Sequence, residues 1–250
     1  MRTQVALITP VVTAGIRTLD DVRPLERPDL SVTHSLLDAG PASIESEFDE
    51  ALCVPDTVRK AMDAERAGAH AIVIDCMGDP GLGACREAVR IPVLGPCQVS
   101  LHVAATLGHR VGFVTVLDRI RPLIDRLVAA YGLRDSYASF RAVDVPVLHL
   151  GSDRAGLQAA LAREALAAVR DDGADVLVLG CTGFLGCAGA MREALLEQGL
   201  DVPVVDPIPL TIHVADALVR SGLAHSGRTY PPPGRKARKG YSFPEFLPAP

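Results

Sequence analysis

The stretch AGAHAIVIDCMGDPG at residues 67–81 has a related copy, DGADVLVLGCTGFLG, at residues 172–186. Each copy places a four-residue apolar run before the pattern Cys-x-Gly-x-x-Gly, which begins at Cys76 in the first copy and at Cys181 in the second. An apolar run of this length is typical of a strand buried on both faces. The repeat therefore predicts two similar lobes, each presenting one cysteine at the C-terminal end of a strand.

The likeness of the two copies continues beyond the cysteines. Arg86-Glu87 and Arg192-Glu193 fall on the helix expected after each motif. Each copy then returns to a Pro-Val pair, at residues 92–93 and 203–204, where the next strand is expected to start. Two βαβ units of the same design are the simplest explanation of this pattern.

Short β-branched runs alternate with longer helical patterns along the whole chain, which is typical of parallel sheets covered by helices on both faces. Strands are expected at residues 5–8, 30–33, 71–74, 93–94, 110–116, 145–148, 176–179 and 204–205. Helices are expected at residues 46–67, 82–89, 98–107, 119–131, 157–171, 188–198 and 210–220. The predicted fold class is α/β, with two similar lobes of parallel sheet flanked by helices. We expect the lobes to be related by a pseudo-two-fold axis, with the active site in the cleft between them.

The repeat also predicts how the chain divides. Residues 1–96 together with 207–229 are expected to form the first lobe, and residues 97–206 the second. Residues 230–250 differ in character, because they hold six of the 19 prolines and four of the ten aromatic residues. Proline at this density disfavours a helix or a central strand. We expect an extended C-terminal arm whose aromatic rings dock on the body or on a neighbouring subunit.

Composition excludes several classes of protein. Apolar residues make up 48% of the 250 residues, which is enough for a sizeable core. A formal net charge of -5 argues against a general nucleic-acid binder. No apolar run approaches the roughly 18 residues that a membrane span needs. Six cysteines are too few for a disulfide scaffold, and Pro10 interrupts the apolar N-terminal stretch, which favours a strand over a signal peptide. A cytoplasmic protein with reduced thiols is the expectation.

The position of the two motif cysteines suggests chemistry. The carboxyl ends of parallel strands are where ligands bind in open α/β sheets. The glycines that follow let the backbone approach a ligand, and a helix starting there would expose N–H groups. Such a helix N-terminus is expected to lower the pKa of a thiol and to favour the thiolate.

Two cysteines on facing lobes can flank one small molecule. A thiolate on one face can remove a proton from carbon, and a thiol on the other face can return a proton with inverted configuration. The alternative is that both cysteines are small buried hydrophobic residues, and the repetition of the motif at equivalent places disfavours it. Thr115, at the end of a strand, is expected at the same sheet edge as a substrate contact.

The remaining candidates carry less weight. Cys53, Cys85, Cys97 and Cys187 are interpreted as structural, and their spacing matches no zinc site. The glycine turns lack the first glycine of a dinucleotide fingerprint, so no metal or cofactor is expected. His102, His149 and His213 are expected in the core or at interfaces, and Asp79 and Asp206 are expected to shape turns.

Several segments of the chain match one known family. They are GPASIES at 40–46 with Asp49-Glu50, CMGDPGL at 76–82 with Arg86-Glu87, PVLG at 92–95, Val114-Thr115, Tyr131-Gly132, LGC at 179–181, and the tail residues Tyr230, Pro232, Lys239 and Gly240. With these segments the chain resembles the hydantoin racemase and allantoin racemase family of the aspartate/glutamate racemase superfamily. The resemblance implies a cofactor-independent two-base mechanism with Cys76 and Cys181 as the two bases. It also implies two lobes with pseudo-two-fold symmetry and a homo-oligomer.

The chain departs from the family pattern at positions where the resemblance places the substrate. Thr9-Pro10-Val11 stands where the family has Asn-Pro-Asn, Met77 replaces Phe, Gln98 replaces Glu, and Thr182-Gly183-Phe184 replaces Ala-Gly-Met. These changes leave the two cysteines in place and bear on which substrate is bound. The expected substrate contacts are Pro10, Met77, Gly78, Thr115, Thr182, Gly183 and Phe184.

Three functions stay open at this point. The first is racemisation of a 5-substituted hydantoin or of allantoin. The second is a different reaction on the same scaffold, either decarboxylation of an arylmalonate-like diacid, which needs only one proton-donating cysteine, or isomerisation of a maleate-like diacid. The third is a non-catalytic binding or redox-sensing protein whose facing cysteines form a disulfide. The expected partner is a small-molecule substrate, with no nucleic acid and no membrane.

Overall fold

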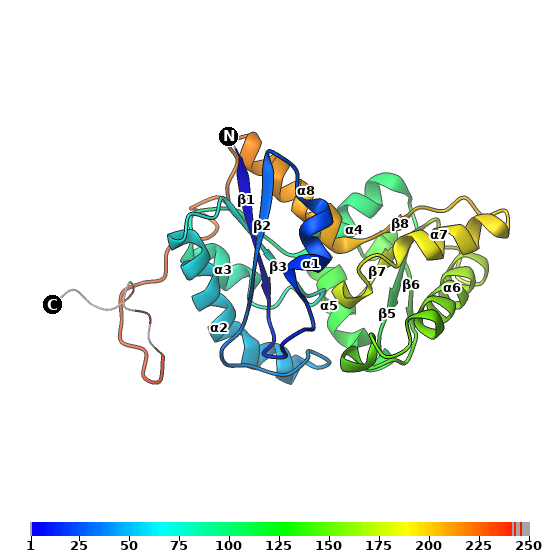
Figure 1. Ribbon diagram of the computed structural model, residues 1–250, viewed down its shortest axis with the longest axis horizontal. Helices are drawn as coiled ribbons and strands as arrows, with labels where there is room; N and C mark the ends of the chain where they lie inside the picture. Colours follow the sequence, from blue (N-terminus) through cyan, green and yellow to red (C-terminus); the bar gives the residue numbers. More distant parts are fainter. Residues whose placement is uncertain (1, 242, 244–245, 247–250) are drawn as a thin grey trace.

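The computed structural model describes residues 2–241, 243 and 246, and these fold into two lobes that lie side by side (Figure 1). Each lobe is built on a four-stranded parallel sheet. The first sheet consists of β1 (Thr3–Thr9), β2 (Leu30–Leu36), β3 (Ala71–Ile74) and β4 (Val93–Leu94). The second consists of β5 (Val111–Thr115), β6 (Tyr137–Ala142), β7 (Val176–Leu179) and β8 (Val204–Val205).

The two sheets have the same topology. Their strand orders are β2-β1-β3-β4 and β6-β5-β7-β8, so each strand of the first sheet has a counterpart four strands later in the second. The counterparts β3 and β7 are the strands that precede the two motif cysteines. The repeat in the sequence is therefore a repeat of the fold, and the predicted fold class is confirmed.

Helices cover both faces of each sheet. They are α1 (Leu19–Val22), α2 (Glu47–Arg66), α3 (Leu82–Ala88), α4 (Pro96–Leu107), α5 (Arg121–Ala130), α6 (Arg154–Arg170), α7 (Ala188–Glu197) and α8 (Pro207–Arg220). In Figure 1, α2 and α3 lie on the outer side of the first lobe, and α6 and α7 on the outer side of the second. Within the described residues no helix is both long and apolar enough to cross a membrane.

Alternation along the buried strands explains this arrangement. In β3, Ile72 and Ile74 pack with the core residues of α2 and α3, whereas Ala71 and Val73 pack with α8 on the opposite face. Successive side chains of a strand point to opposite faces of the sheet, so a strand covered on both sides must be apolar throughout. All four residues of β3 and all four of β7 are buried.

The helix that follows the last strand of each sheet crosses to the other lobe. After β4, α4 packs its Leu101 and Ala104 against the second sheet. After β8, α8 packs its Ile208 and Ile212 against the first sheet. α4 and α8 also contact each other. This reciprocal exchange fixes the two lobes relative to one another and brings the carboxyl ends of their strands together.

One predicted strand is wrong. Residues 145–148 are not a strand, because Pro146 has no N–H to donate and Val147–His149 forms a 3-10 turn. The fourth strand of the second sheet is β6, which pairs with β5 and forms the edge of the sheet. Most of its residues are only partly buried, so it lacks the continuous apolar run of the central strands.

The C-terminal segment begins with a specific side-chain contact to the first lobe. Nη1 of Arg86 lies 3.2 Å from the hydroxyl oxygen of Tyr230 and donates to it, and the guanidinium also lies over the Tyr230 ring. Phe243 and Phe246 pack against the apolar cluster of α2 and α3. Of the predicted arm, residues 242, 244–245 and 247–250 lie outside the described residues.

Candidate active site

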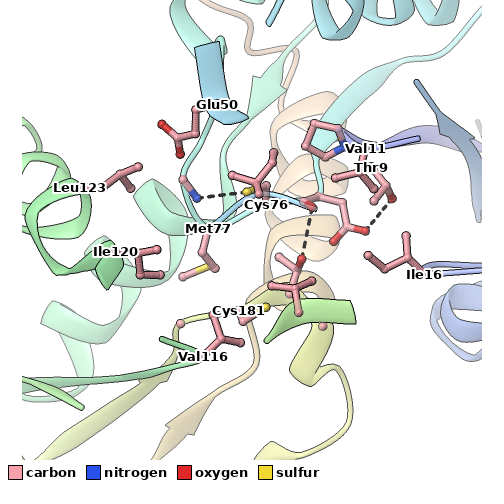
Figure 2. Close-up of a pocket in the computed structure, with 18 of the residues that line it drawn as sticks. Thr9, Val11, Ile16, Glu50, Cys76, Met77, Val116, Ile120, Leu123 and Cys181 are labelled. Carbon is pink, nitrogen blue, oxygen red and sulfur yellow. Dashed lines mark hydrogen bonds between the residues drawn. The ribbon is translucent and has the colours of Figure 1, made fainter. Parts of the chain in front are cut away.

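A cavity of about 80 Å³ lies between the two lobes, at the carboxyl ends of β1, β3, β5 and β7. Cys76, which follows β3, and Cys181, which follows β7, both line it. Figure 2 shows the two cysteines on segments that belong to different lobes, with the cavity residues around them. The structure therefore brings together the two residues that the sequence repeat singled out.

The pattern Cys-x-Gly has a local reason in both motifs. The amide N–H of Gly78 donates to Sγ of Cys76 at 3.4 Å. The amide N–H of Gly183 donates to Sγ of Cys181 in the equivalent way. Each bond favours the thiolate over the thiol, since a thiolate is the stronger acceptor. The two motifs thus present their sulfur atoms with the same backbone support.

Neither cysteine lies at the N-terminus of an α-helix, contrary to the sequence expectation, although Cys181 directly precedes the single 3-10 turn Thr182–Phe184. α3 begins only at Leu82, after Gly81 has turned the chain with a positive φ of 69°, and α7 begins only at Ala188. Burial raises the pKa of Cys181 to about 11 and also raises the pKa of Cys76 well above its ordinary value. Both groups are therefore neutral thiols at rest near neutral pH.

A buried ion pair lies directly behind the cysteines. Arg17 donates to both carboxylate oxygens of Asp75, at 2.9 and 3.3 Å, and Thr9 donates to the same carboxylate at 2.8 Å. The guanidinium also donates to the carbonyl of Thr182 in the other lobe at 2.6 Å. In return the Thr182 hydroxyl donates to the carbonyl of Asp75 at 3.2 Å. These contacts link the residue before Cys76 to the residue after Cys181.

Asp79 anchors the first motif to helix α4. Its carboxylate accepts the N–H groups of Cys97 and Gln98 at 3.0 and 2.8 Å, in the first turn of that helix, and the hydroxyl of Tyr131 at 2.7 Å. A side chain at Gly95 would collide with this carboxylate, because its Cβ would lie 2.3 Å from Cγ of Asp79. Burial raises the pKa of Asp79 to about 6 despite these donors. Asp79 therefore shapes the turn, as predicted, and also caps a helix.

A second acidic residue, Glu50 on α2, lines the cavity (Figure 2) and lies beside Gly78. Its Oε1 atom is buried and has no hydrogen-bond partner in the part of the chain that the structure describes. Burial raises the pKa of Glu50 to about 7, with the negative charge of Asp79 as the next largest cause. The cavity thus holds one carboxyl group that titrates near neutral pH.

Most of the remaining wall is apolar. Side chains from both lobes contribute, and those of Ile120 and Leu123 pack beside Met77 (Figure 2). The apolar lining residues are Val11, Ile16, Ile44, Met77, Val116, Ile120, Leu123, Ile124 and Val147. A small site of this kind excludes water and takes an apolar group beside the two thiols.

Five of the seven predicted substrate contacts line the cavity. They are Pro10, Met77, Gly78, Thr182 and Gly183. Thr115 does not line it, because its fully buried hydroxyl donates to the carbonyl of Gly180 at 2.8 Å and so holds the residue before Cys181. Phe184 does not line it either, because its ring is fully buried in the core of the second lobe.

The other residues considered at the sequence level lie away from the cavity. Cys53, Cys85, Cys97 and Cys187 are buried free thiols in the cores of the lobes. His102, His149 and His213 are exposed, so none of them lies in the core, and a place at an interface stays a prediction. Asp206 accepts the N–H of Gly186 at 2.8 Å and thereby holds the turn after the second motif.

Sequence reasoning missed Arg17 and Glu50. Arg17 stands in a loop segment 58 residues before its partner Asp75, and nothing around it marks a site. Glu50 lies in a segment that matches the family, but that match assigns it no role. A signal was available for it, since Glu50 lies in the first turn of α2, where a charged residue facing the lobe interface needs a reason to be there.

Comparison with known proteins agrees with this geometry. The Asp/Glu/Hydantoin racemase family model matches residues 17–215. The chain is 36% identical over 238 residues to a hydantoin racemase of Rhizobium meliloti, which covers 94% of this chain and 97% of that protein. The solved allantoin racemase of Klebsiella pneumoniae superposes with a TM-score of 0.87 at 30% identity, covering 99% of this chain and all of that one.

A more distant neighbour shows the breadth of the fold. Arylmalonate decarboxylase superposes with a TM-score of 0.64 at 23% identity, over 91% of this chain and 98% of that one, so the likeness is one of fold. The family match covers well over half of the chain and includes both lobes. The chain therefore belongs to the Asp/Glu/Hydantoin racemase family and is an isomerase of the racemase type.

Proposed function

We propose that this racemase inverts C5 of hydantoins that carry an apolar 5-substituent, with Cys76 and Cys181 as the two acid–base groups. The observation that carries the proposal is that both thiols line one small, largely apolar cavity from opposite lobes. A two-base inversion needs a proton acceptor on one face of the carbon and a proton donor on the other.

The proton balance of the reaction is simple. One cysteine, as thiolate, takes the proton from C5, and the electron pair of the C–H bond delocalises onto the neighbouring ring carbonyl. The other cysteine, as thiol, then gives its proton to the opposite face of C5. The product is the mirror image, and the two cysteines have exchanged protonation states. A second turnover in the reverse direction restores them.

The neutral resting state of both thiols fits an enzyme that makes its thiolate only when needed. Burial disfavours a thiolate in the empty cavity, while the amides of Gly78 and Gly183 stabilise it. After burial, the next largest cause at Cys181 is the amide of Gly183, which lowers its pKa, whereas at Cys76 it is the charge of Glu50, which raises its pKa. This difference favours Cys181 as the first thiolate and Cys76 as the first thiol.

The lining favours a hydantoin over allantoin. Allantoin carries a polar ureido group on the reacting carbon, and that group would bury its N–H and carbonyl groups against isoleucine, leucine and valine side chains. A buried polar group without a partner is unfavourable by about 1–3 kcal/mol. An alkyl or methylthioalkyl substituent would instead gain from the same burial.

The alternatives are weaker on the same grounds. Decarboxylation of a diacid needs only one proton-donating cysteine and a site for two carboxylates, whereas this cavity is lined mainly by apolar side chains. Isomerisation of a maleate-like diacid meets the same objection. A redox-sensing role would use a disulfide, and in the structure both cysteines are free thiols.

Polarimetry tests the proposal. Single enantiomers of 5-isobutyl-, 5-benzyl- and 5-(methylthioethyl)hydantoin, together with allantoin, aspartate and an arylmalonate, should be incubated with the purified protein. We expect loss of optical rotation for the alkylhydantoins, slower loss for allantoin and none for aspartate. Stable rotation with every hydantoin would contradict the proposal, and carbon dioxide release from the malonate would favour the decarboxylase instead.

Several properties stay predictions. We propose that the substrate is the only small-molecule partner, that the protein is a cytoplasmic homo-oligomer, and that no nucleic acid binds. We also propose that the chain divides into residues 1–96 with 207–229, residues 97–206, and an arm at 230–250. Gel filtration with light scattering, and limited proteolysis around residue 229, would test the assembly and the arm.

A further inference from the structure

Among the polar side chains that line the cavity, Glu50 carries a carboxyl group that is used neither by the racemase chemistry nor by the Arg17–Asp75 ion pair. Glu50 lies in the first turn of α2, with its carboxyl group beside Gly78 (Figure 2). A Cβ placed on Gly78 would lie 1.7 Å from Oε1 of Glu50 and 3.7 Å from Sγ of Cys76. Glu50 and the Cys76 thiol are therefore neighbours on either side of one glycine.

Oε1 of Glu50 is left without a partner although charged groups are near. It is buried, and the described residues offer it no hydrogen-bond donor. Arg126, the cation that acts on it, is engaged with Glu47 in an ion pair. An unpaired buried acceptor is unfavourable by about 1–3 kcal/mol, so a chain that keeps one on a cavity wall has a use for it when the cavity is filled.

We propose that Glu50 binds the substrate by accepting the N1–H of the hydantoin ring. This inference rests on the proposed function and assigns a further substrate contact to the same site. N1 is bonded directly to C5, the carbon that must meet the Cys76 thiol. A group beside Cys76 therefore faces N1 rather than N3, which lies across the ring. A carboxylate would repel the ring carbonyl oxygens, so it also selects the orientation of the ring.

The surrounding charges decide when Glu50 can accept this bond. Burial raises its pKa to about 7, Asp79 and Glu47 raise it as well, and Arg126 lowers it. The thiols of Cys53, Cys76 and Cys97 also face it, and they are neutral at this pH because burial raises each of their pKa values. A ring N–H would stabilise the ionised form, so binding near pH 7 should release protons from Glu50.

Binding calorimetry with three racemic ligands tests the proposal. Racemic 5-isobutylhydantoin gives no net conversion, so its heat reports binding alone, and its N1-methyl and N3-methyl derivatives differ only in the donor removed. The proteins are the wild type, Glu50→Leu, Glu50→Gln and the control Glu193→Gln, which changes an exposed glutamate on α7. Measurements at pH 7 in two buffers of different ionisation enthalpy give the protons released.

We expect the wild type and Glu193→Gln to bind the N1-methyl ligand at least 10-fold more weakly than the parent, since a hydrogen bond to a charged group is worth about 1.5–3 kcal/mol. The N3-methyl ligand should bind within a few-fold of the parent. Glu50→Leu should lose the discrimination and the proton release. Glu50→Gln keeps an uncharged acceptor, so it should retain part of the discrimination without proton release.

A stability measurement separates this role from a structural one. Replacing an unpaired buried carboxyl group by leucine should leave the protein at least as heat-stable at pH 8, while substrate binding weakens. A residue that merely supported the fold would lower the melting temperature when removed. Glu50→Gln provides the same comparison if Glu50→Leu does not fold.

Two results would overturn the inference. Equal binding of the N1-methyl ligand and the parent by the wild type would show that no N1–H contact exists. Unchanged discrimination in Glu50→Leu would assign the contact to another residue. In both cases racemisation of hydantoins would persist, which leaves the proposed function standing. Failure of the wild type to bind or racemise any hydantoin would instead contradict both the proposed function and the role of Glu50.

Discussion

Arg17 and Asp75 form a buried ion pair, in which the two side chains are only 6% and 1% exposed. The same guanidinium reaches the carbonyl of Thr182 in the second lobe. Although burial acts to raise it, Arg17 holds the pKa of Asp75 below its ordinary value. The pair therefore joins the lobes at the point where both catalytic loops begin, and it keeps a negative charge behind Cys76 and Cys181.

Removing one partner of this pair should be more harmful than removing both. Arg17→Met leaves a buried carboxylate without its cation, and we expect a loss of about 3–5 kcal/mol in the free energy of unfolding. The double variant Arg17→Met/Asp75→Asn should lose less than Arg17→Met alone, because it leaves no unpaired buried charge. Urea unfolding of the four proteins of this cycle measures the coupling.

The exposed pair Arg192–Asp201, at 3.3 Å, supplies the control. Arg192→Met should change the free energy of unfolding by less than about 1 kcal/mol, because surface pairs contribute little. If Arg17→Met lowered the free energy of unfolding as little as Arg192→Met, the Arg17–Asp75 pair between the lobes would not be important for the fold.

The strands were predictable from the sequence where every residue of the strand is apolar. β3 and β7 were predicted with the bounds they have, because four consecutive apolar residues fit only a strand covered on both faces. β6 was missed because an edge strand is half exposed and mixes Ser and Arg with Phe. Pro146 should have excluded the strand predicted at residues 145–148.

The residues of the site were predictable only where their sequence motif is duplicated. Cys76 and Cys181 were identified because the fold duplicates their motif, whereas Arg17 acts on Thr182 across 165 residues without any local signature. The expected α-helix N-termini failed for a geometric reason, although Cys181 does precede the 3-10 turn Thr182–Phe184. A turn residue with positive φ, Gly81 or Gly186, separates each cysteine from its α-helix, and a sequence pattern does not give the distance.

The state of the thiols should be visible in their alkylation by iodoacetamide. Only a thiolate reacts, so the rate should rise about tenfold for each pH unit between pH 7 and 9.5. Burial raises the pKa of both thiols, but the amide of Gly183 lowers that of Cys181 whereas the charge of Glu50 raises that of Cys76, so Cys181 should be labelled first. Peptide mapping by mass spectrometry gives the order, and substrate should protect both. A rate that levels off below pH 8 would mean that one thiol is ionised at rest.

Two glycine substitutions distinguish an effect on the active site from an effect on the rest of the fold. Gly78→Ala would place its Cβ 1.7 Å from Oε1 of Glu50, so that carboxyl group must move. We expect kcat/KM to fall by about 10- to 100-fold, which corresponds to a lost hydrogen bond to a charged group. Gly83→Ala, on α3, meets nothing within 4 Å and should keep its activity while gaining about 0.5–1 kcal/mol of stability. Equal activity of both variants would contradict the placement of Glu50.

Glu50 should also make stability depend on pH. Its pKa is about 7 in the folded protein and near 4.5 when exposed, so the folded state holds the proton more tightly. Stability from this group is therefore present below pH 4.5 and is lost as the pH rises through 7. The melting temperature of Glu50→Gln minus that of the wild type should increase from pH 5 to pH 8. Glu193→Gln should show no such trend, and a flat difference for Glu50→Gln would place its carboxyl group in water.

The two catalytic cysteines should be separable by hydrogen exchange. Cys76→Ala and Cys181→Ala each remove the acid–base group on one face of C5, so each should lower racemisation by at least about 10²–10⁴-fold. The thiol that remains can still remove the proton facing it and return deuterium from solvent to the same face. Because the cysteines approach from opposite lobes, the two variants should exchange opposite enantiomers without converting either.

Proton NMR of the C5–H signal in D₂O, recorded for each enantiomer with each variant, measures this directly. Cys85→Ala, which changes a buried core thiol, should racemise normally and serves as the control. Exchange of the same enantiomer by both variants, or near wild-type racemisation by either, would exclude opposed thiols as the two bases.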